Sequence, residues 1–262
     1  MTPKGLIALG RAVLARMKVD NVSLLASAIA FWGMLALVPA LVALVSLYGL
    51  VADPADVERQ VRESTQALPA AAQQLIVTQL RAVVDAPSAG LGTGLVIGLA
   101  VALFAASAGM RTLITAVGVV YGDRAGDKGF VTERGQALGL TLGGIAFVAG
   151  AVLVVAVIPS HHLLWVTQWL VLGAGLVLGL GILYRLGPTR HPEPRLLSPG
   201  AVVAAVLVVA VTMAFSLYTS SFNSYNETYG SLAAVVILLL WLQLGALTIL
   251  IGATLNRELA AG

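Results

Sequence analysis

The sequence contains no cysteine and little charge. None of its 262 residues is Cys, and Asp, Glu, Lys and Arg together make up 10% of the chain, against about 25% in an average soluble protein. The missing thiols exclude disulfide scaffolds, cysteine nucleophiles and Cys-ligated zinc or iron–sulfur centres. The scarcity of charge excludes a water-soluble fold, because 59% of the residues are apolar and a domain of this length could not hide them all from water. The composition is that of an integral membrane protein.

Catalytic motifs are also missing from the sequence. It has no His-Glu-x-x-His, Gly-x-Ser-x-Gly, Walker A or dinucleotide-binding pattern. His161 and His162 are adjacent and would project about 100° apart on a helix, while His191 is predicted on the other side of the membrane. We therefore expect no enzyme activity, no catalytic residue, no metal site and no cofactor.

Long uncharged runs are abundant. A helix needs about 20 mostly apolar residues to cross a hydrocarbon core of about 30 Å. Because the runs are continuously apolar and do not alternate, they argue against barrel strands. We predict an all-α integral membrane protein with six transmembrane helices, in one membrane domain over residues 22–262. The predicted spans are residues 22–52, 91–110, 136–159, 162–184, 196–221 and 230–255.

The distribution of basic residues predicts the orientation of the chain. Lys and Arg near membrane helices are retained on the cytoplasmic side. With the N-terminus inside, all but three of the 15 basic residues fall on that side, the exceptions being Arg59, Arg62 and Arg81. Both termini are therefore predicted to be cytoplasmic. The net charge of +3 is then explained by topology, and we expect no nucleic-acid partner.

Residues 1–21 are predicted to form a cytoplasmic amphipathic helix that lies on the inner leaflet. Its basic face would meet anionic headgroups, so Lys4, Arg11 and Lys18 are the membrane-surface residues that we predict. An ordinary flank that only fixes topology is the alternative. The apolar and basic residues occupy separate helical faces: Leu6, Leu9, Val13 and Met17 on one, and Lys4, Arg11 and Lys18 on the other.

The loop of residues 53–90 is too long for a simple connection and is predicted to form an extracytoplasmic two-helix cap. Asp53 and Pro54 make a favourable helix start, and Pro69 separates the two helices. A structural cap is the main interpretation, and a lid or a docking surface is the alternative.

Uncharged polar residues inside or at the ends of the spans are the candidates for a binding site. An amide or a phenol in a bilayer needs a polar partner. Contacts between helices are the commoner role of such residues, and contact with a substrate is the alternative. Pro39 removes a backbone hydrogen bond within the first span and is a candidate hinge. The candidate substrate-binding residues are Tyr48, Gln168, Asn223, Asn226, Tyr229, Gly230 and Gln243.

Glycines recur at four-residue spacing within three of the predicted spans. Such spacing lets helix backbones approach closely, either within one chain or between two copies. We therefore keep a homo-oligomer among the expected assemblies. The glycines are Gly90, Gly94 and Gly98, then Gly139 and Gly143, then Gly175 and Gly179.

Two stretches of the sequence resemble a known family. The first runs Ala-Ser-Ala-Ile-Ala-Phe-Trp from Ala26 and continues through Leu-Val-Pro-Ala-Leu at residues 37–41. The second runs Tyr-Asn-Glu-Thr-Tyr-Gly-Ser-Leu from Tyr225 and ends with Gly-Ala-Thr-Leu-Asn from Gly252. They resemble the opening span and the C-terminal signature of the YihY / virulence factor BrkB family. With the six-span layout, the resemblance extends over essentially the whole chain.

The resemblance implies a multi-pass protein of the bacterial inner membrane with no firmly assigned biochemical activity. Some members carry a ribonuclease BN label, against which the lack of clustered metal ligands in this chain argues. The sequence departs from the family pattern at Thr254, where Glu is common, and at Trp32, where Tyr is frequent. A mechanism that needs a carboxylate at position 254 is therefore not expected here.

We expect the protein to transport or translocate a lipid or another hydrophobic molecule of the envelope. A bundle without buried coupling charges suits an apolar substrate. The alternative is a non-transporting membrane scaffold or partner subunit in envelope assembly. The expected partners are membrane lipids, together with an envelope protein or a second copy of the chain. An ion channel is less favoured, because it needs a continuous polar stripe that the scattered amides do not supply.

Overall fold

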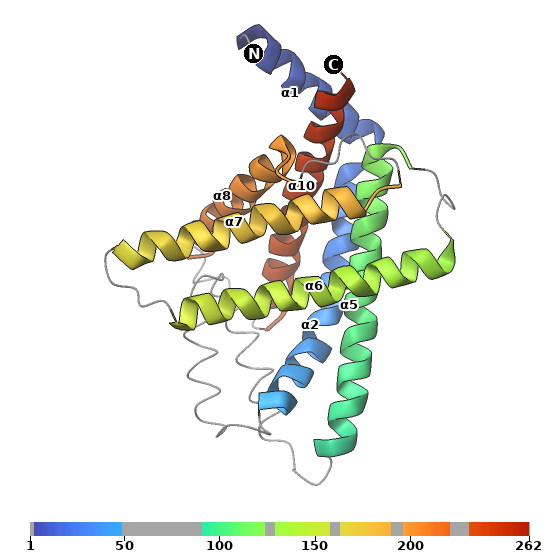
Figure 1. Cartoon of the computed structure of the whole chain (residues 1–262), viewed down its shortest axis with the longest axis vertical. Helices are drawn as coiled ribbons and strands as arrows, with labels where there is room; N and C mark the ends of the chain where they lie inside the picture. Colours follow the sequence, from blue (N-terminus) through green and yellow to red (C-terminus); the bar gives the residue numbers. More distant parts are fainter. Residues whose placement is uncertain are drawn as a thin grey trace. The chain divides into compact units, whose positions relative to one another are not determined.

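The computed structural model describes residues 3–48, 91–123, 129–157, 163–189, 196–220 and 231–261, with the side chains of most of them. These residues form seven helices and contain no strand, which confirms the predicted all-helical class for this part of the chain (Figure 1). The helices are α1 (Pro3–Val19), α2 (Val22–Tyr48), α5 (Leu91–Tyr121), α6 (Phe130–Val157), α7 (Leu163–Leu186), α8 (Pro199–Ser220) and α10 (Ser231–Ala261).

The chain divides into two compact units. Unit 1 comprises Met1–Ile29, Met110–Ala210 and Gln243–Gly262. Unit 2 comprises Ala30–Gly109 and Val211–Leu242. Helices α2, α5, α8 and α10 therefore each contribute residues to both units.

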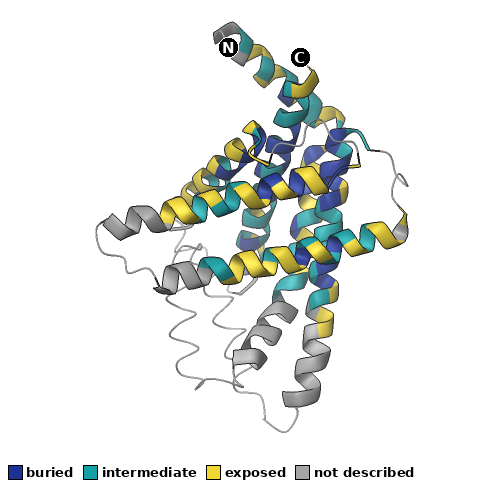
Figure 2. Ribbon diagram, viewed as in Figure 1, coloured by how far each residue is buried: buried dark blue, intermediate teal, exposed yellow. Residues whose placement is uncertain are grey.

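The core of unit 1 is rich in small side chains, and its buried residues are dark blue in Figure 2. Ala26, Val117, Ala201 and Ala253 are completely buried there, and they come from four different helices. Lipid is as apolar as a protein core, so close backbone packing, rather than transfer out of water, holds membrane helices together. Alanine and valine allow that close packing.

Helices α6 and α7 of unit 1 pack side by side and antiparallel (Figure 1). A Cβ atom added to Gly175 of α7 would lie 2.8 Å from Cε2 of Phe147 on α6, which explains the glycine at that position. Gly139 and Gly143 of α6 instead face open space. Only Gly175 of these predicted close-approach glycines therefore makes such a contact within unit 1.

Unit 2 is held together by aromatic side chains in the described residues. Trp32 of α2 lies against Gly109 of α5, with 3.5 Å between the Trp32 Cβ and the place of a Cβ at Gly109. Trp241 of α10 donates a hydrogen bond of 3.3 Å from Nε1 to the Thr212 hydroxyl of α8. At position 32, where the sequence departs from the family pattern, the Cβ and the backbone of Trp32 therefore pack against a glycine.

Four described helical segments are long and apolar enough to cross a membrane, and counting the bent pair α1–α2 as one span gives up to five. The helix holding the second predicted span continues from residue 110 to Tyr121, because the next stop signal is Gly122. The six-span count and the cytoplasmic termini remain predictions, and the predicted cap at residues 53–90 lies outside the described residues. The four segments are Leu103–Tyr121, Trp169–Leu186, Pro199–Tyr218 and Val235–Ala261.

Candidate functional site

The described polar side chains of unit 1 converge where five elements meet: the α1–α2 turn, the end of α5, the end of α7, the start of α8 and the last turns of α10. We call this set of contacts the polar junction. Its residues are Arg16, Asp20, Tyr121, Tyr184, Ser198, Gly200, Asn256 and Arg257.

Helix α5 ends in a Schellman motif that prepares one side of the junction. Gly122 has a φ of 88°, in the left-handed region that favours glycine. Its N–H donates to the Val119 carbonyl at 3.0 Å, and the Asp123 N–H donates to the Gly118 carbonyl at 2.9 Å. The Val120 carbonyl accepts from the Arg257 guanidinium of α10, so this helix end is closed by a distant side chain.

Helix α8 begins with a sequence-encoded cap. Ser198 is the N-cap, and its hydroxyl accepts from the Ala201 N–H at 3.2 Å. Pro199 occupies the first helical position, where its missing N–H is harmless. The cap places the Ser198 hydroxyl and the Gly200 N–H together at the start of the helix, facing α10.

Asn256 of the C-terminal signature joins three helices through one amide. Its Oδ1 accepts from the Gly200 N–H at 2.7 Å. Its Nδ2 donates to the Ser198 hydroxyl at 2.9 Å and to the Tyr121 hydroxyl at 3.2 Å. The amide therefore links the end of α5 and the start of α8 to α10, and aspartate or leucine could not reproduce this combination of donor and acceptor.

Helices α8 and α10 are in backbone contact beside that amide. A Cβ atom on Gly200 would collide with the Gly252 carbonyl, and one on Gly252 would collide with the Gly200 carbonyl. Tyr184 of α7 closes the same place, since its hydroxyl lies 2.7 Å from the position of a Gly252 Cβ. That hydroxyl donates to the Ile249 carbonyl at 2.5 Å.

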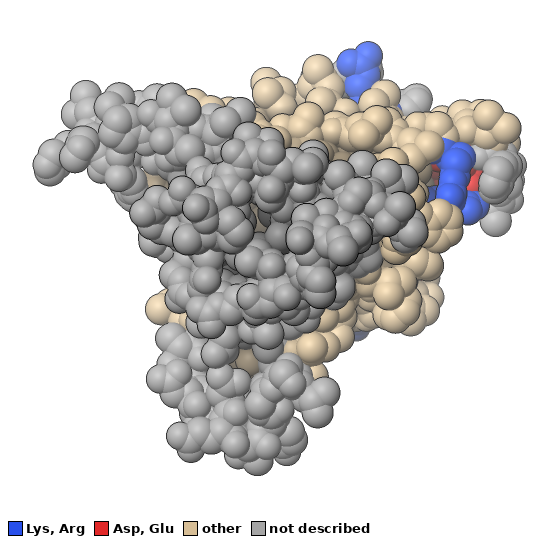
Figure 3. All heavy atoms as spheres, turned by 90° about the horizontal axis from the view of Figure 1, so that it is seen from below, with Lys and Arg blue, Asp and Glu red and all other residues tan. Residues whose placement is uncertain are grey.

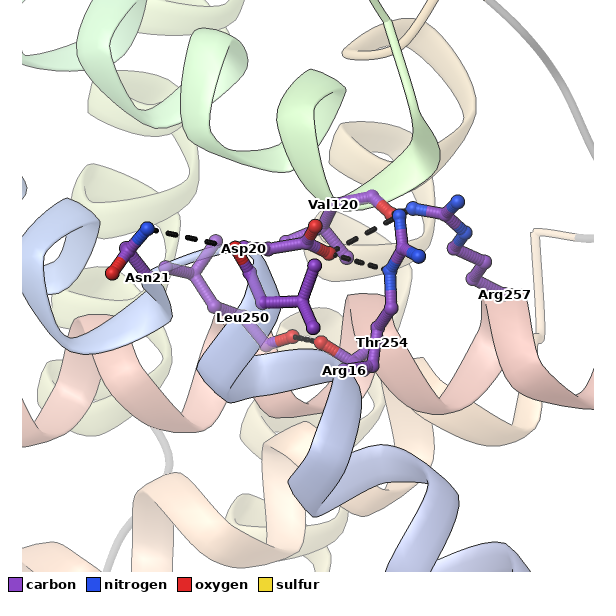
Figure 4. Close-up of polar contacts among 8 residues, drawn as sticks. Arg16, Asp20, Asn21, Val120, Leu250, Thr254 and Arg257 are labelled. Carbon is purple, nitrogen blue, oxygen red and sulfur yellow. Dashed lines mark hydrogen bonds and ion pairs between the residues drawn. The ribbon is translucent and has the colours of Figure 1, made fainter.

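Asp20 connects the α1–α2 turn to α10 (Figure 4). Its Oδ2 accepts from Arg16 Nε at 2.8 Å and lies 3.7 Å from Nη1 of Arg257. The next residue, Asn21, has a φ of 51°, a conformation that Asn tolerates better than most residues. The Asn21 carbonyl accepts from the N–H groups of Leu24 and Leu25, so this residue ends the turn and begins α2.

Thr254 stands where Glu is common in the resembling family. Its side chain is fully buried, and its hydroxyl donates to the Leu250 carbonyl at 2.8 Å. The hydroxyl is thus satisfied within its own helix. The other buried hydroxyls, those of Ser107, Thr141 and Thr248, also bond to a carbonyl three or four residues earlier. In the described part of the chain, these groups are structural.

The structure places the predicted site residues unevenly. Gln243 lies in α10 with its side chain partly exposed, while Arg11 and Lys18 lie exposed on α1. Tyr48, Gln168, Pro39 and Lys4 lie within helices, but their side chains are not among those described. Asn223, Asn226, Tyr229 and Gly230 lie outside the described residues. The proposed substrate-contact set therefore stays a prediction.

Sequence reasoning missed most of the polar junction. It recognised Asn256 only as part of a family signature, counted Arg257 only among the cytoplasmic basic residues, and did not single out Asp20. Two local signals were available: Ser198-Pro199-Gly200 is a helix start, and Gly122 follows a long apolar helix. The local sequence of these two helix ends does not predict which distant groups they contact.

The donors, acceptors and charged groups of the polar junction bond to one another. This arrangement can hold helices together. No cluster of three or more His, Cys, Asp or Glu residues able to bind a metal is found among the described residues. Outside the polar junction, Arg111 of α5 forms an ion pair with Glu133 of α6 at 2.9 Å.

Comparison with known proteins identifies the family. Residues 13–261 match the family described as Virulence factor BrkB. The Putative ribonuclease-like protein YfkH of Bacillus subtilis (strain 168) is 25% identical over 246 residues, which cover 88% of this chain and 87% of that protein.

Shorter matches are found in Xanthomonas. UPF0761 membrane proteins of Xanthomonas oryzae pv. oryzae (strain PXO99A) and Xanthomonas campestris pv. campestris (strain B100) are 38% and 36% identical over 80 residues. These matches cover 30% of this chain but only 19% of each of those proteins. No solved structure matches the chain. The family match confirms the resemblance carried by the N-terminal span and the C-terminal signature: the chain is a membrane protein of the virulence factor BrkB family.

Proposed function

We propose that this membrane protein of the bacterial inner membrane moves a lipid, or another hydrophobic molecule of the envelope, between membrane environments. The observation that supports the proposal is the apolar surface of α6 and α7. Long apolar side chains project from both helices of this pair, and an acyl chain could lie against them without a buried charge. The exposed members are Leu142, Ile145 and Val148 on α6, and Leu170, Leu178 and Ile182 on α7.

The distribution of charge also favours an apolar substrate. Among the described atoms visible in Figure 3, uncharged ones predominate and the charged ones lie near the edge of the view. The carboxylates of Asp20 and Glu133 are already paired, Asp20 with Arg16 and Arg257 in the polar junction and Glu133 with Arg111. Ion-coupled transport usually relies on a titratable group within the spans, so we propose movement of lipid without such coupling.

The direct test is lipid exchange between leaflets in reconstituted vesicles. The vesicles contain phospholipid with a fluorescent label, and a membrane-impermeant reductant reports how fast the label becomes accessible. We expect faster exchange than in protein-free vesicles, and slower exchange for Leu142→Ala and Leu178→Ala than for the matched surface variant Val206→Ala on α8. Equal rates with and without protein, while tryptophan fluorescence shows a normal unfolding transition, would overturn the proposal.

A membrane scaffold is the second candidate, and a separate observation favours it. Gly139 and Gly143 of α6 face open space, and such a pair is the kind of surface on which another membrane helix packs. The scaffold function predicts a stable complex, with a second copy or with an envelope protein, that Gly143→Leu abolishes. A monomer that is unchanged by Gly143→Leu would remove this candidate.

The ribonuclease-like wording in the name of YfkH is not transferred to this chain. We propose that the protein is not an enzyme, which is supported by the lack of clustered metal ligands and by the missing catalytic patterns of its sequence. A purified protein that cleaves RNA, with the activity lost on unfolding, would contradict this.

A further inference from the structure

Helix α1 carries two kinds of face. Val13 is buried, and Met17 packs against the core of unit 1. The opposite stripe holds Ile7, Arg11, Leu14 and Lys18, which share one line along the helix because they are spaced four, three and four residues apart. Ile7 and Leu14 are 60% and 62% exposed, and Arg11 and Lys18 are exposed as well.

The basic residues of α1 are divided between its two sides. Arg16 turns away from the exposed stripe and pairs with Asp20 at 2.8 Å, with 30% of its side chain exposed. Arg11 and Lys18 remain on the stripe, and α1 contains no acidic residue. Sequence periodicity places Arg11 and Lys18 on one face and leaves Arg16 off it, and the structure adds that Arg16 is paired with Asp20.

The stripe has the chemistry of a membrane headgroup boundary. Exposed Ile and Leu side chains are unfavourable in water, and Arg and Lys are costly in hydrocarbon. Side by side on one helix, they fit the boundary where acyl chains meet phosphates, because long basic side chains extend toward the phosphates while the apolar ones enter the lipid. The axis of α1 is also turned by 64° from the start of α2, so α1 cannot continue along the direction of that apolar helix.

The polar junction fixes the orientation of the stripe. Asp20 pairs with Arg16 on α1 and with Arg257 on α10, and so anchors the end of α1 to unit 1. Rotation of α1 about its axis would break the Arg16 contact and would expose Val13. The stripe is therefore held facing away from the core.

From these contacts we infer that the stripe formed by Ile7, Arg11, Leu14 and Lys18 binds the headgroups of anionic phospholipids in the bilayer that holds the protein. The phosphate of the lipid is the group recognised by Arg11 and Lys18, and its acyl region accommodates Ile7 and Leu14. This binding is independent of lipid movement, so the inference stands or falls separately from the proposed function.

The test uses the full chain in lipid discs with increasing fractions of phosphatidylglycerol in phosphatidylcholine. Since the chain has no cysteine, an Ala15→Cys change beside the stripe supplies a single position for an environment-sensitive dye. We expect the emission to shift to the blue and to saturate as phosphatidylglycerol increases. The Arg11→Gln, Lys18→Gln variant should bind anionic lipid approximately 30-fold more weakly, since each basic residue near an anionic surface contributes about 1 kcal/mol. Its emission should therefore stay almost unshifted at the phosphatidylglycerol fraction that gives the midpoint of the unchanged protein.

Two matched variants separate binding from structure. Arg16→Gln removes one positive charge from the same helix but not from the stripe. It should lower the unfolding temperature and move the lipid midpoint less than Arg11→Gln does, because Val13 still packs into the core. Arg11→Lys should bind as well as the unchanged protein, because it keeps the charge that Arg11→Gln removes.

Several outcomes would overturn the inference. One is an emission shift that does not depend on phosphatidylglycerol, and another is an equal midpoint in the double Gln variant. A shift that follows the number of protein copies in each disc would assign the stripe to a second copy. Competition by inorganic phosphate, beyond that of chloride at equal ionic strength, would assign it to a soluble anion.

Discussion

Two helix pairs within unit 1 meet in different ways. Helices α8 and α10 touch through their backbones at Gly200 and Gly252, and polar side chains seal the contact on one side. Helices α6 and α7 meet through a large side chain, Phe147 against Gly175, and leave Gly139 and Gly143 in open space. Glycine thus makes a fixed backbone contact in one pair, and in the other pair two glycines lie on an exposed surface.

The difference between the two pairs shows which contacts must accompany glycine for two membrane helices to pack stably. Dispersion between closely packed backbones gives the contact, but lipid competes for every apolar surface. Around Gly252, hydrogen bonds of Asn256 and Tyr184 stabilise the helix contact against this competition from lipid. Helices α6 and α7 meet through Phe147 and Gly175 and leave two glycines of α6 in open space, so this pair is the one we expect to adjust to partners.

Glycine replacement should give the largest effect on stability, and it tests the difference between the two helix pairs most directly. We expect Gly252→Ala to destabilise the fold by about 3 kcal/mol, because its methyl group meets a backbone carbonyl that cannot move freely. The matched change Gly143→Ala should be neutral or stabilising by up to about 1 kcal/mol, as Ala favours a helix over Gly. Thermal unfolding followed by tryptophan fluorescence checks both, and equal melting temperatures would contradict the assigned packing.

Removal of the Asn256 amide comes next. Asn256→Ala should cost about 2–3 kcal/mol, since three hydrogen bonds of about 1 kcal/mol each are lost. Gln243→Ala, on the same helix and partly exposed, is the matched control and should change stability by less than about 1 kcal/mol. Guanidinium unfolding in detergent measures the difference. A variant as stable as the control would show that the amide does not hold α5 and α8 to α10.

Asp20 should have a smaller effect. Its side chain is 9% exposed, but its partners Arg16 and Arg257 are about one quarter to one third exposed, so water weakens the attraction. We expect Asp20→Asn to cost about 1–2 kcal/mol, with most of the loss in the Arg16 contact. A double-mutant cycle with Arg16→Gln measures that coupling, and additive losses would separate the two residues energetically.

The smallest effect should come from the ion pair on the α5–α6 contact. Arg111 is 44% exposed beside Glu133, and exposed pairs contribute about 0–1 kcal/mol. Arg111→Gln should therefore lower the stability by at most about 1 kcal/mol, and the loss should shrink in high salt because screening already weakens the pair. A loss as large as that of Asn256→Ala would mean that α5 and α6 are locked like α8 and α10.

The helices could be predicted because each one depends on the pattern of residues within its own segment. Hydropathy predicted the apolar segments that became α2, α7, α8 and α10, and the basic and apolar periodicity of residues 4–19 predicted α1. The extension of α5 to Tyr121 was missed because Arg111 looked like a membrane boundary, whereas a helix stops at a signal such as Gly122 and not at a single charge.

The polar junction was not predictable for a different reason. Asn256 and Arg257 bond to groups that lie 58 and 137 residues earlier in the chain. A local pattern cannot reveal such pairs, because it reports which faces are apolar but not which helices meet. The pair formed by Asp20 and Arg257 is similar, since these residues are also far apart in the sequence.

The long chain separations at the polar junction also fix an order of events in biogenesis. Helices α5, α7 and α8 leave the ribosome well before α10, and the Asn256 and Arg257 side chains they need arrive only with that last helix. The earlier helices of unit 1 are therefore inserted before they can pack fully, and their packing is completed when α10 joins them. During that interval the α8 glycine surface is open to other membrane helices, so a pause in synthesis before residue 252 should leave the nascent chain sensitive to protease until synthesis resumes.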